Sequence, residues 1–269
     1  MVARSYAVVN QKGGVAKTTT VINLAACAAL EDYSVLVVDM DPQGNATSGL
    51  GIDKGQLEYC MYDLLCQAPG QSGPMVDEVI VPTEVPNLDV LPATIDLAGA
   101  QLYLANVLSR ETRLRRVLQP VRDLYDLIVI DTAPSLGLLT FNALAAVEQV
   151  IIPIQAEYYA LEGLTQLVEI IQMVQAEINP GLTIAGAVLT LYDHRTKLAE
   201  EVAEDVTRNF LGRTFRTRIP RNVRLAEAPS YGLPAVLYDR HCPGSSAYFR
   251  LYWEVFGDAQ EEGTGPRPE

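Results

Sequence analysis

The chain has 269 residues, of which 49% are hydrophobic and 20% are charged, and its formal net charge is −13. This length and composition are enough for one sizeable core, and no apolar run approaches the ~18 residues that a membrane-spanning helix needs. The acidic average argues against binding nucleic acid over the whole surface. The N-terminal residues lead into a strand-like stretch with no room for the apolar core of a signal peptide, so we expect a cytoplasmic protein.

Short β-branched apolar runs alternate with longer helical patterns. In chain order, strands are predicted at Tyr6–Asn10, Ser34–Asp39, Leu88–Leu91, Leu127–Asp131, Gln149–Ile154, Leu182–Thr190 and Thr214–Ile219. Helices are predicted at Thr18–Leu30, Leu161–Ile178, Lys197–Phe210 and Ser245–Phe256. Apolar strands without two-residue alternation, separated by helices, indicate an α/β fold with a doubly wound, mostly parallel sheet and helices on both faces. In such sheets ligands bind at the carboxyl ends of the strands.

Four cysteines are scattered along the chain without a CxxC pair. They are Cys27, Cys60, Cys66 and Cys242. In a reducing compartment such isolated thiols indicate neither disulfides nor a zinc site, so we expect them to be small core residues.

A glycine-containing loop, KGGVAKTT at Lys12–Thr19, separates the first predicted strand from the first predicted helix. Gly13 and Gly14 let the backbone turn tightly, so that successive N–H groups converge on phosphate oxygens at the positive end of the helix. Lys17 would neutralise the β- and γ-phosphates, and the Thr18 hydroxyl would ligate Mg²⁺. A glycine turn with a surface lysine is the alternative, and the strand–loop–helix context argues against it.

Aspartates stand at the ends of two predicted strands. Asp39 and Asp41 close the second strand, and Asp131 closes the LIVID strand. An aspartate after four apolar strand residues is typical of a Walker B position, which holds Mg²⁺ directly or through water. Each aspartate alone is a weak signal, because strand ends also carry aspartate as a cap or turn residue. Their order after a phosphate loop favours the metal site.

The loop departs from the general G-x-x-x-x-G-K-[ST] pattern, because Gln11 and Ala16 occupy its two glycine positions. It resembles instead KGGxxK[ST], the deviant Walker A loop of the ParA/MinD/nitrogenase-iron-protein group. The resemblance implies that Lys12, otherwise a solvated loop lysine, reaches the nucleotide of a partner subunit in a homodimer that sandwiches two ATP molecules. Many relatives carry glycine at position 16. Alanine fits there easily if its φ is negative; we expect nucleotide binding to survive, with dimer closure and hydrolysis the steps open to change.

The resemblance also assigns roles around ATP and Mg²⁺. VDMDPQGN resembles the family's switch I segment, which implies that Asp41 orients the attacking water and that Asp39 supports the Mg²⁺ shell. The implied catalytic residues are Lys12, Lys17 and Asp41. The implied metal site is Thr18, Asp39 and Asp131, with Thr132–Ser135 as switch II. The implied nucleotide-binding residues are Gly13, Gly14, Val15, Ala16, Lys17, Thr18 and Thr19, with Pro220 and Asn222 near the base.

A basic stretch interrupts this acidic chain at Val206–Arg224. It contains no acidic residue and six arginines, namely Arg208, Arg213, Arg216, Arg218, Arg221 and Arg224. Arginine suits phosphate because of its fixed donor fork, and a local patch can hold DNA backbone despite a negative average. Pairing with acids such as Glu200, Glu201 and Glu204 is the alternative.

Two segments of this region, YDHRTKLAEEV and IPRNVRLAEAPSYG, resemble ParA segments that contact DNA. The implied DNA-binding residues are Arg195, Arg218, Arg221 and Arg224. Their contacts would go to phosphates of double-stranded DNA without sequence preference. Because a dimer doubles the patch, binding should depend on ATP and fall steeply with salt.

The resemblance covers residues 5–256, and the chain is identified as similar to the ParA/Soj family of DNA-partitioning ATPases. We expect residues 1–256 to form a single P-loop ATPase domain and the Gly- and Pro-containing acidic residues 257–269 to be a disordered tail. Gln67–Pro86, rich in glycine, proline and serine, is expected to be a surface excursion. The resemblance further implies a ParB-like activator and association with the nucleoid in the ATP-bound form.

Four alternatives remain open at this point. A MinD-like membrane switch would need a basic amphipathic C-terminal helix, whereas this C-terminus is acidic and non-periodic. An iron–sulfur carrier would need bridging cysteines that the chain does not place. A non-hydrolysing adaptor would use Ala16 to stay locked. A ParA relative that positions a protein cargo would show the same motifs.

Overall fold

A computed structural model of the protein describes residues 3–68, 70, 72–157, 160–210 and 212–257. Within these residues an eight-stranded sheet runs in the order β3-β4-β2-β5-β1-β6-β7-β8. All neighbouring strands are parallel except β3, which pairs antiparallel with β4 at one edge. The strands are β1 Arg4–Val8, β2 Val35–Met40, β3 Val81–Pro82, β4 Leu88–Leu91, β5 Leu127–Thr132, β6 Gln149–Gln155, β7 Thr183–Tyr192 and β8 Thr214–Pro220.

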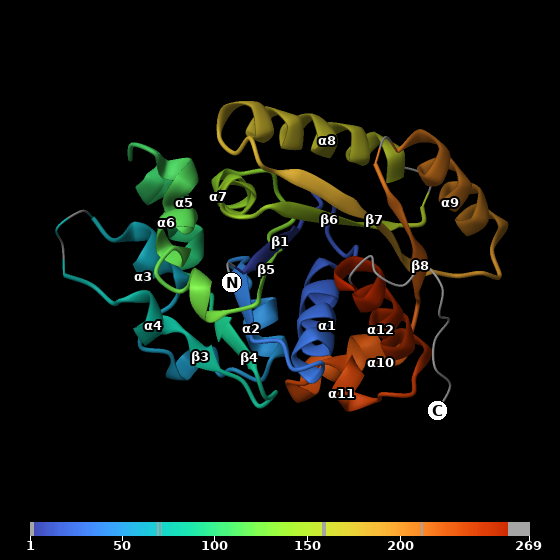
Figure 1. Ribbon diagram of the computed structural model, residues 1–269, viewed down its shortest axis with the longest axis horizontal. Coiled ribbons are helices and arrows are strands. Elements are labelled where there is room, and N and C mark those ends of the chain that lie inside the picture. The colour runs from blue at the N-terminus through green and yellow to red at the C-terminus, as the bar shows by residue number, and fades with distance from the viewer. Residues whose placement is uncertain (1–2, 69, 71, 158–159, 211, 258–269) are drawn as a thin grey trace.

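Helices cover both faces of this sheet (Figure 1). The longer ones are α1 Lys17–Leu30, α5 Leu97–Leu104, α7 Leu138–Ala146, α8 Ala160–Glu177, α9 Lys197–Asn209 and α12 Pro243–Phe256. The shorter ones are α2 Asn45–Gly49, α3 Met61–Cys66, α4 Val76–Val79, α6 Arg113–Leu118, α10 Val223–Glu227 and α11 Ala235–Tyr238. Single 3₁₀ turns lie at Lys54–Gln56, Arg110–Thr112, Arg122–Leu124 and Ala228–Tyr231.

The strands bury side chains on both of their faces, which is why they lack a polar alternation. Along β5, Ile128 and Ile130 face a core shared with α3 and with α5 to α9. Leu127 and Val129 face the opposite core, shared with α1 and α12. All six residues of β5 are buried. The predicted doubly wound α/β fold is confirmed.

Each predicted strand and helix is present, with ends that move by one to a few residues. The first strand is the clearest difference, because it is Arg4–Val8 and not Tyr6–Asn10. Asn10 lies outside it because its side chain is used elsewhere: the amide donates to the Pro153 carbonyl (2.7 Å), and its oxygen accepts the Lys12 N–H (2.9 Å). The strand therefore gives way to the loop two residues early.

The surface excursion expected at Gln67–Pro86 is partly corrected by the structure. It contains helix α4 and the edge strand β3, and Val76, Val79 and Val85 are buried. These three valines pack into the hydrophobic cores and so attach the segment to the rest of the domain. The disorder expected at 257–269 falls, apart from Gly257, outside the described residues.

The four cysteines are buried free thiols, as expected. Among the helices that the structure describes, none combines the length and apolarity required to cross a membrane.

Asn142, on α7, links this helix to α6 and to the 3₁₀ turn before it. The residue is fully buried; its amide donates to the carbonyls of Arg110 (2.8 Å) and Leu138 (2.9 Å), and its oxygen accepts the Leu114 N–H (3.1 Å). Removing the side chain deletes three hydrogen bonds and leaves the buried Leu114 N–H unpaired, and an unpaired buried group costs about 1–3 kcal/mol. Asn142→Ala should therefore lower the free energy of unfolding by roughly 2–4 kcal/mol in urea titrations.

Asn209→Ala, at the exposed end of α9, makes the same chemical change and should alter stability by less than about 0.5 kcal/mol. Equal losses in the two variants would show that Asn142 has no special role.

Candidate nucleotide site

The loop between β1 and α1 is held in place from two sides. Asn10 fixes its first turn, as described above. On the far side, the Thr190 hydroxyl at the end of β7 donates to the Val15 carbonyl (3.0 Å), and Thr190 is fully buried. Gly14 and Ala16 both adopt left-handed backbone conformations, with φ 74° and φ 64°. The loop is thus wrapped around the start of α1, where free N–H groups and the helix dipole favour an anion.

Lys17 and Thr18, the first residues of α1, face the strand ends. The Lys17 ammonium donates to the Lys12 carbonyl across the loop (2.9 Å). The Thr18 hydroxyl donates to the carboxylate of Asp131 (2.7 Å). Burial lowers the pKa of Lys17, and the nearby carboxylates of Asp131 and Asp41 oppose that shift. A hydroxyl and a carboxylate are therefore side by side beside a cation, at the place where a phosphate would meet the loop.

Asp39 and Asp131 occupy paired positions on the neighbouring strands β2 and β5, and both are fully buried. Burial raises the pKa of Asp39 to about 6, an effect that hydrogen bonds from Thr47 partly offset. The pKa of Asp131 is raised well above its usual range, first by burial and then by the charge of Asp39. Two buried carboxyl groups in this arrangement destabilise each other's charged form, and a bound cation would relieve that cost.

Asp39 is held by the chain that follows it. One of its oxygens accepts the Thr47 backbone N–H (2.9 Å) and hydroxyl (2.7 Å), and the other accepts the Asp41 N–H (3.1 Å). Asp41 in turn accepts the Gln43 N–H through its side chain (3.0 Å) and the Gly44 N–H through its carbonyl (2.8 Å). The strand end thus sets the position of the Asp41 turn.

A cavity of about 390 Å³ lies over the loop. Of the predicted nucleotide-binding residues, Gly13, Gly14, Ala16, Lys17, Thr18, Thr19 and Asn222 line it, as does the predicted catalytic residue Asp41. Val15 is buried beneath the loop, and Pro220 is half-buried two residues before Asn222 without lining the cavity. The structure therefore brings together residues from β2, α1 and the segment after β8.

Lys12 lies outside this cavity. Its ammonium forms an ion pair with Glu157 just after β6 (2.6 Å), and both side chains are nearly half exposed, at 45% and 48%. The Glu157 carboxylate also accepts a hydrogen bond from the Gln155 amide. An exposed pair of this kind contributes at most about 1 kcal/mol, so Lys12 can leave Glu157 at small cost.

Sequence reasoning missed several residues that shape the cavity. Thr190 and Leu191 close the loop side, and Leu191 has a left-handed φ of 50°. Leu225 and Ala226, on α10, add an apolar wall. A threonine near the end of a buried apolar strand was the available signal for Thr190. No sequence signal indicated the left-handed backbone of Leu191.

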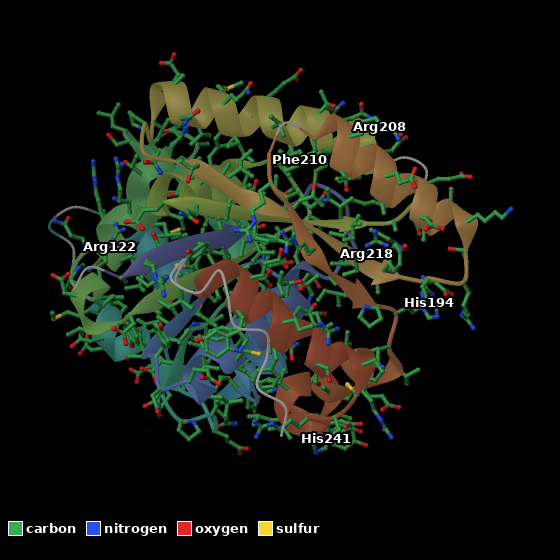
Figure 2. The ribbon with its side chains drawn as sticks, turned by 45° about the vertical axis from the view of Figure 1, so that its right-hand side comes forward. Arg122, His194, Arg208, Phe210, Arg218 and His241 are labelled. Atoms are coloured by element: carbon green, nitrogen blue, oxygen red, sulfur yellow. The ribbon has the colours of Figure 1, made fainter. Side chains whose placement is uncertain are left out.

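The four arginines predicted to bind DNA meet around the ends of β7 and β8. Arg218 stacks on the Tyr192 ring, with its guanidinium 4.6 Å from the ring centre. The Arg221 N–H donates to the Tyr192 carbonyl (3.2 Å). Figure 2 shows Arg218 and His194 on the same side of the molecule, where these strands end.

The predicted alternative of acid pairing applies to only some of these arginines. Arg195 forms a forked contact with Asp193 (2.8 and 2.6 Å), and Arg224 contacts Glu227 (2.9 Å) and Asp239 (3.3 Å). Among the suggested partners on α9, Glu204 contacts a different arginine, Arg208 (3.9 Å). Within the described residues the Arg221 side chain has no ion pair. All these contacts are exposed and therefore weak, so they leave the arginines available to a phosphate.

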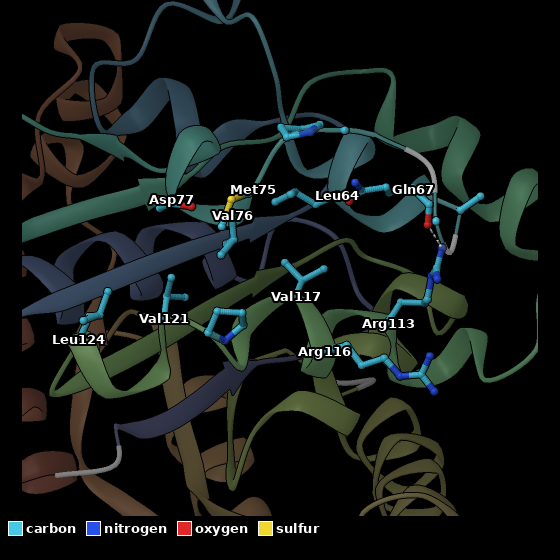
Figure 3. A pocket seen from close by; sticks show the side chains of 15 residues that line it. Leu64, Gln67, Met75, Val76, Asp77, Arg113, Arg116, Val117, Val121 and Leu124 are labelled. Carbon is cyan, nitrogen blue, oxygen red and sulfur yellow. Dashed lines mark hydrogen bonds between the residues drawn. The ribbon is translucent and has the colours of Figure 1, made fainter.

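A larger hollow of about 610 Å³ lies elsewhere, between α3, α4 and α6 (Figure 3). Its walls are mostly apolar, as at Val76, Val117 and Val121, and Arg113 at one side donates to the Gln67 carbonyl (2.6 Å). It shares no lining residue with the cavity over the loop. The cavity over the loop is smaller, but it is the one that holds the convergent polar groups of a phosphate site.

The fold and this site define a P-loop nucleotide-binding protein. A family model described as "AAA domain" matches residues 3–184. The chain is 53% identical over 249 residues to the sporulation initiation inhibitor protein Soj of Bacillus subtilis, covering 93% of this chain and 96% of that protein. It is 49% identical over 247 residues to the chromosome-partitioning ATPase Soj of Treponema pallidum, covering 92% and 94%.

Among solved structures, the chain is similar to a cobyrinic acid a,c-diamide synthase from Mycobacterium smegmatis with bound ATP analogue and magnesium. The TM-score is 0.81 with 37% identity, and the match covers 93% of each chain. Together with the relatives above, this similarity extends over nearly the whole chain. The protein belongs to the ParA/Soj family of chromosome-partitioning ATPases.

The condition under which alanine fits easily at position 16 is not met, because Ala16 has a left-handed φ of 64°. A left-handed backbone conformation costs a residue with a Cβ roughly 1–2 kcal/mol. Glycine avoids this strain, but it also raises the conformational entropy of the unfolded chain, which offsets part of the stabilisation. Ala16→Gly should therefore raise the free energy of unfolding by about 0.5–1 kcal/mol, measured by urea denaturation without nucleotide.

Gly14→Ala is the matched control with the opposite sign. Gly14 has φ 74°, and a Cβ built there would meet no atom within 4 Å. The added methyl group brings backbone strain without a collision, so stability should fall by about 1 kcal/mol. A loss of stability in Ala16→Gly would contradict the strain at position 16.

Proposed function

We propose that this ATPase is a nucleotide-controlled DNA switch for partitioning chromosome or plasmid DNA. In this proposal ATP and Mg²⁺ bind at the loop, two copies close into a dimer over the nucleotides, and the dimer binds DNA without sequence preference. Hydrolysis, stimulated by a ParB-like partner, causes the dimer to dissociate and releases the DNA. The protein then acts in the cytoplasm, on the nucleoid while ATP is bound.

The residues present fit ATP with Mg²⁺. Magnesium prefers oxygen ligands, and the Thr18 hydroxyl and Asp131 carboxylate lie 2.7 Å apart at the strand ends. Asp39 would support the ion's shell indirectly, since its own oxygens hold the Asp41 turn. Bound Mg²⁺ would neutralise charge on the phosphates, while Lys17 and the loop N–H groups would position them. Asp41 lines the cavity, which supports our proposal that it orients the attacking water.

Dimer formation is supported by the position of Lys12. It stands at the rim and is exposed, and only a weak contact with Glu157 holds it. Because it does not line its own cavity, we infer that it acts on the nucleotide of the second subunit. The Lys12–Glu157 pair would open as the dimer closes.

One short segment carries the proposed link between nucleotide and DNA. Asn222 lines the nucleotide cavity, and the exposed arginines Arg221 and Arg224 stand on either side of it. The Asn222 side chain also accepts the Arg224 N–H at the start of α10 (2.9 Å). A nucleotide that orders Asn222 would therefore order these two arginines, and dimerisation would double the number of phosphate contacts. Arg195 and Arg218 would extend the same surface.

Asp41→Ala should separate nucleotide binding from hydrolysis. Positioning supplies most of the catalysis in phosphoryl transfer, so we expect phosphate release to fall roughly a hundredfold or more, while ATP binding and dimer formation remain. Phosphate release and sedimentation with ATP measure the two effects. Asp123→Ala, at an exposed position on another side of the molecule, should leave both unchanged; turnover at the wild-type rate in Asp41→Ala would remove Asp41 from the mechanism.

A gel-shift titration of a random-sequence duplex with ADP, ATP and a slowly hydrolysed ATP analogue tests the switch itself. Binding should be strong only with the triphosphate and should fall steeply with salt. Arg221→Ala should weaken it roughly tenfold, because each dimer loses two charge-assisted contacts, and should reduce the salt slope.

Arg115→Ala removes an equally exposed arginine from α6 and is the matched control. Its affinity for the duplex should stay within about twofold of the wild type. Equal binding with ADP and ATP would overturn the switch, and equal losses in both variants would overturn the DNA surface.

A further inference from the structure

The hollow of about 610 Å³ between α3, α4 and α6 is not used by any function described above (Figure 3). A volume of this size is typical of sites that enclose a small organic molecule. Its lining is mostly apolar. We call it the α3–α6 hollow and define it by six of its lining residues, namely Leu64, Val76, Arg113, Arg116, Val117 and Val121.

Arg113 places a buried positive charge in this lining. The residue is only 9% exposed, and its guanidinium donates from Nε to the Leu65 carbonyl (3.1 Å) and from Nη2 to the Gln67 carbonyl (2.6 Å). These carbonyls lie at the end of α3, where the helix dipole favours a cation without supplying a full negative charge. Within the described residues Arg113 has no ion pair, and its Nη1 nitrogen has no hydrogen bond. A buried charge without a counter-ion is costly, and a bound anion would remove that cost.

Arg116 adds a second cation at the same end of the hollow. It follows Arg113 by three positions on α6, and residues at this spacing share one face of a helix. Figure 3 shows both guanidinium groups at one end, with Val121 and Leu124 at the other. Arg116 is exposed and, in the part of the chain that the structure describes, forms no hydrogen bond or ion pair. Two arginines without an acidic partner therefore stand together.

The opposite end of the hollow is apolar and partly open to solvent. Met75 and Leu124 belong to its lining and are 65% and 66% exposed, whereas Val76 and Val121 are buried. A carboxylate in the lining, Asp77, is exposed and lies beside Val76, away from the arginines in Figure 3. The hollow thus combines one cationic end with an apolar body.

We propose that the α3–α6 hollow is a binding site for a small amphipathic anion. A carboxylate or phosphate head would lie at the end of Arg113 and Arg116, and an apolar body would cover the valines of the lining. Charge-assisted hydrogen bonds from the two guanidinium groups hold the head, and burial of the exposed apolar side chains adds to the affinity. The site is independent of the proposed function, because it shares no lining residue with the nucleotide cavity.

A free small molecule suits this hollow better than DNA or an anionic membrane does. The net charge of −13 repels extended polyanions from most of the surface. Duplex DNA presents charged phosphates along its outside and offers no apolar body to the valines. A single small anion needs only the two local arginines.

Isothermal titration calorimetry of the full chain without nucleotide tests the selection of the head group. Octanoate, octanol and octylammonium share one chain length and differ in charge. Octanoate should bind at one saturable site, octanol about tenfold more weakly, and octylammonium without measurable affinity. Hydrogen exchange with octanoate should show protection at residues 61–67 and 113–121 and none at residues 12–19. Equal affinities for octanoate and octanol, or no saturable binding of octanoate, would overturn the proposal.

Arg116→Gln should weaken octanoate binding about tenfold and leave octanol binding unchanged, because it removes one charge-assisted contact. Arg115→Gln is the matched control. It removes the same charge from the same helix, at an exposed position that does not line the hollow, and should shift the Kd less than about twofold. Equal weakening by the two variants would show a response to net charge alone, and the site would be refuted.

Because Arg113 also supports the end of α3, its substitution would mix an effect on stability with an effect on binding. Val117→Phe avoids this difficulty, since it keeps both arginines and fills the hollow from a half-buried position. It should weaken octanoate and octanol together by about tenfold or more, with thermal unfolding as the check on folding. Full octanoate affinity in a folded Val117→Phe protein would place the ligand elsewhere and contradict the proposal.

Two other sources of binding give different results. If ATP with Mg²⁺ displaces octanoate, the ligand occupies the nucleotide cavity and the proposal is wrong. If the protein sediments with phosphatidylglycerol vesicles and Arg116→Gln abolishes this, the arginines contact a membrane surface and the proposal is also wrong. Calorimetry with octanoate requires neither hydrolysis nor DNA. Failure of the wild type to hydrolyse ATP or to bind DNA would therefore overturn the proposed function and leave the measurement on the hollow standing.

Discussion

Asp39 and Asp131, side by side at the ends of β2 and β5, impose an electrostatic cost that the surrounding structure offsets. Three groups around them supply the compensation, one from the start of α2 and two from the start of α1. Thr47 anchors the start of α2 to Asp39, Thr18 anchors the phosphate loop to Asp131, and Lys17 supplies a nearby positive charge. The starts of α1 and α2 are therefore tied to two buried carboxyl groups, which explains how a cation bound there could reorganise the site.

Strands β6, β7 and β8 connect the nucleotide site to the exposed arginines. Thr190 on β7 holds the phosphate loop from below, and two residues later the Tyr192 carbonyl accepts the Arg221 N–H. The same strand end thus supports the nucleotide and carries the basic surface. On the opposite flank, Lys54 holds the turn of Asp41 from outside.

The regular parts of the fold were predictable because β-branched runs and long helical patterns have strong local preferences. The helices α3 to α7, between residues 61 and 146, were not predicted. Helix α7 has nearly all its residues buried and so shows no polar face, and α3, α4 and α6 are too short to establish a period. The edge strand β3 was not predicted for a similar reason, because a strand of two residues is too short to show an alternation of polar and apolar side chains.

The sequence by itself determined the phosphate loop, the strand-end aspartates and the family, because glycine, lysine and carboxylate at fixed spacings have local chemical meaning. It could not determine that Ala16 is left-handed, that Lys12 rests on Glu157, or that Thr190 supports the loop. Those contacts join residues up to 175 positions apart, and they exist only because parallel strands bring their carboxyl ends to one edge of the sheet.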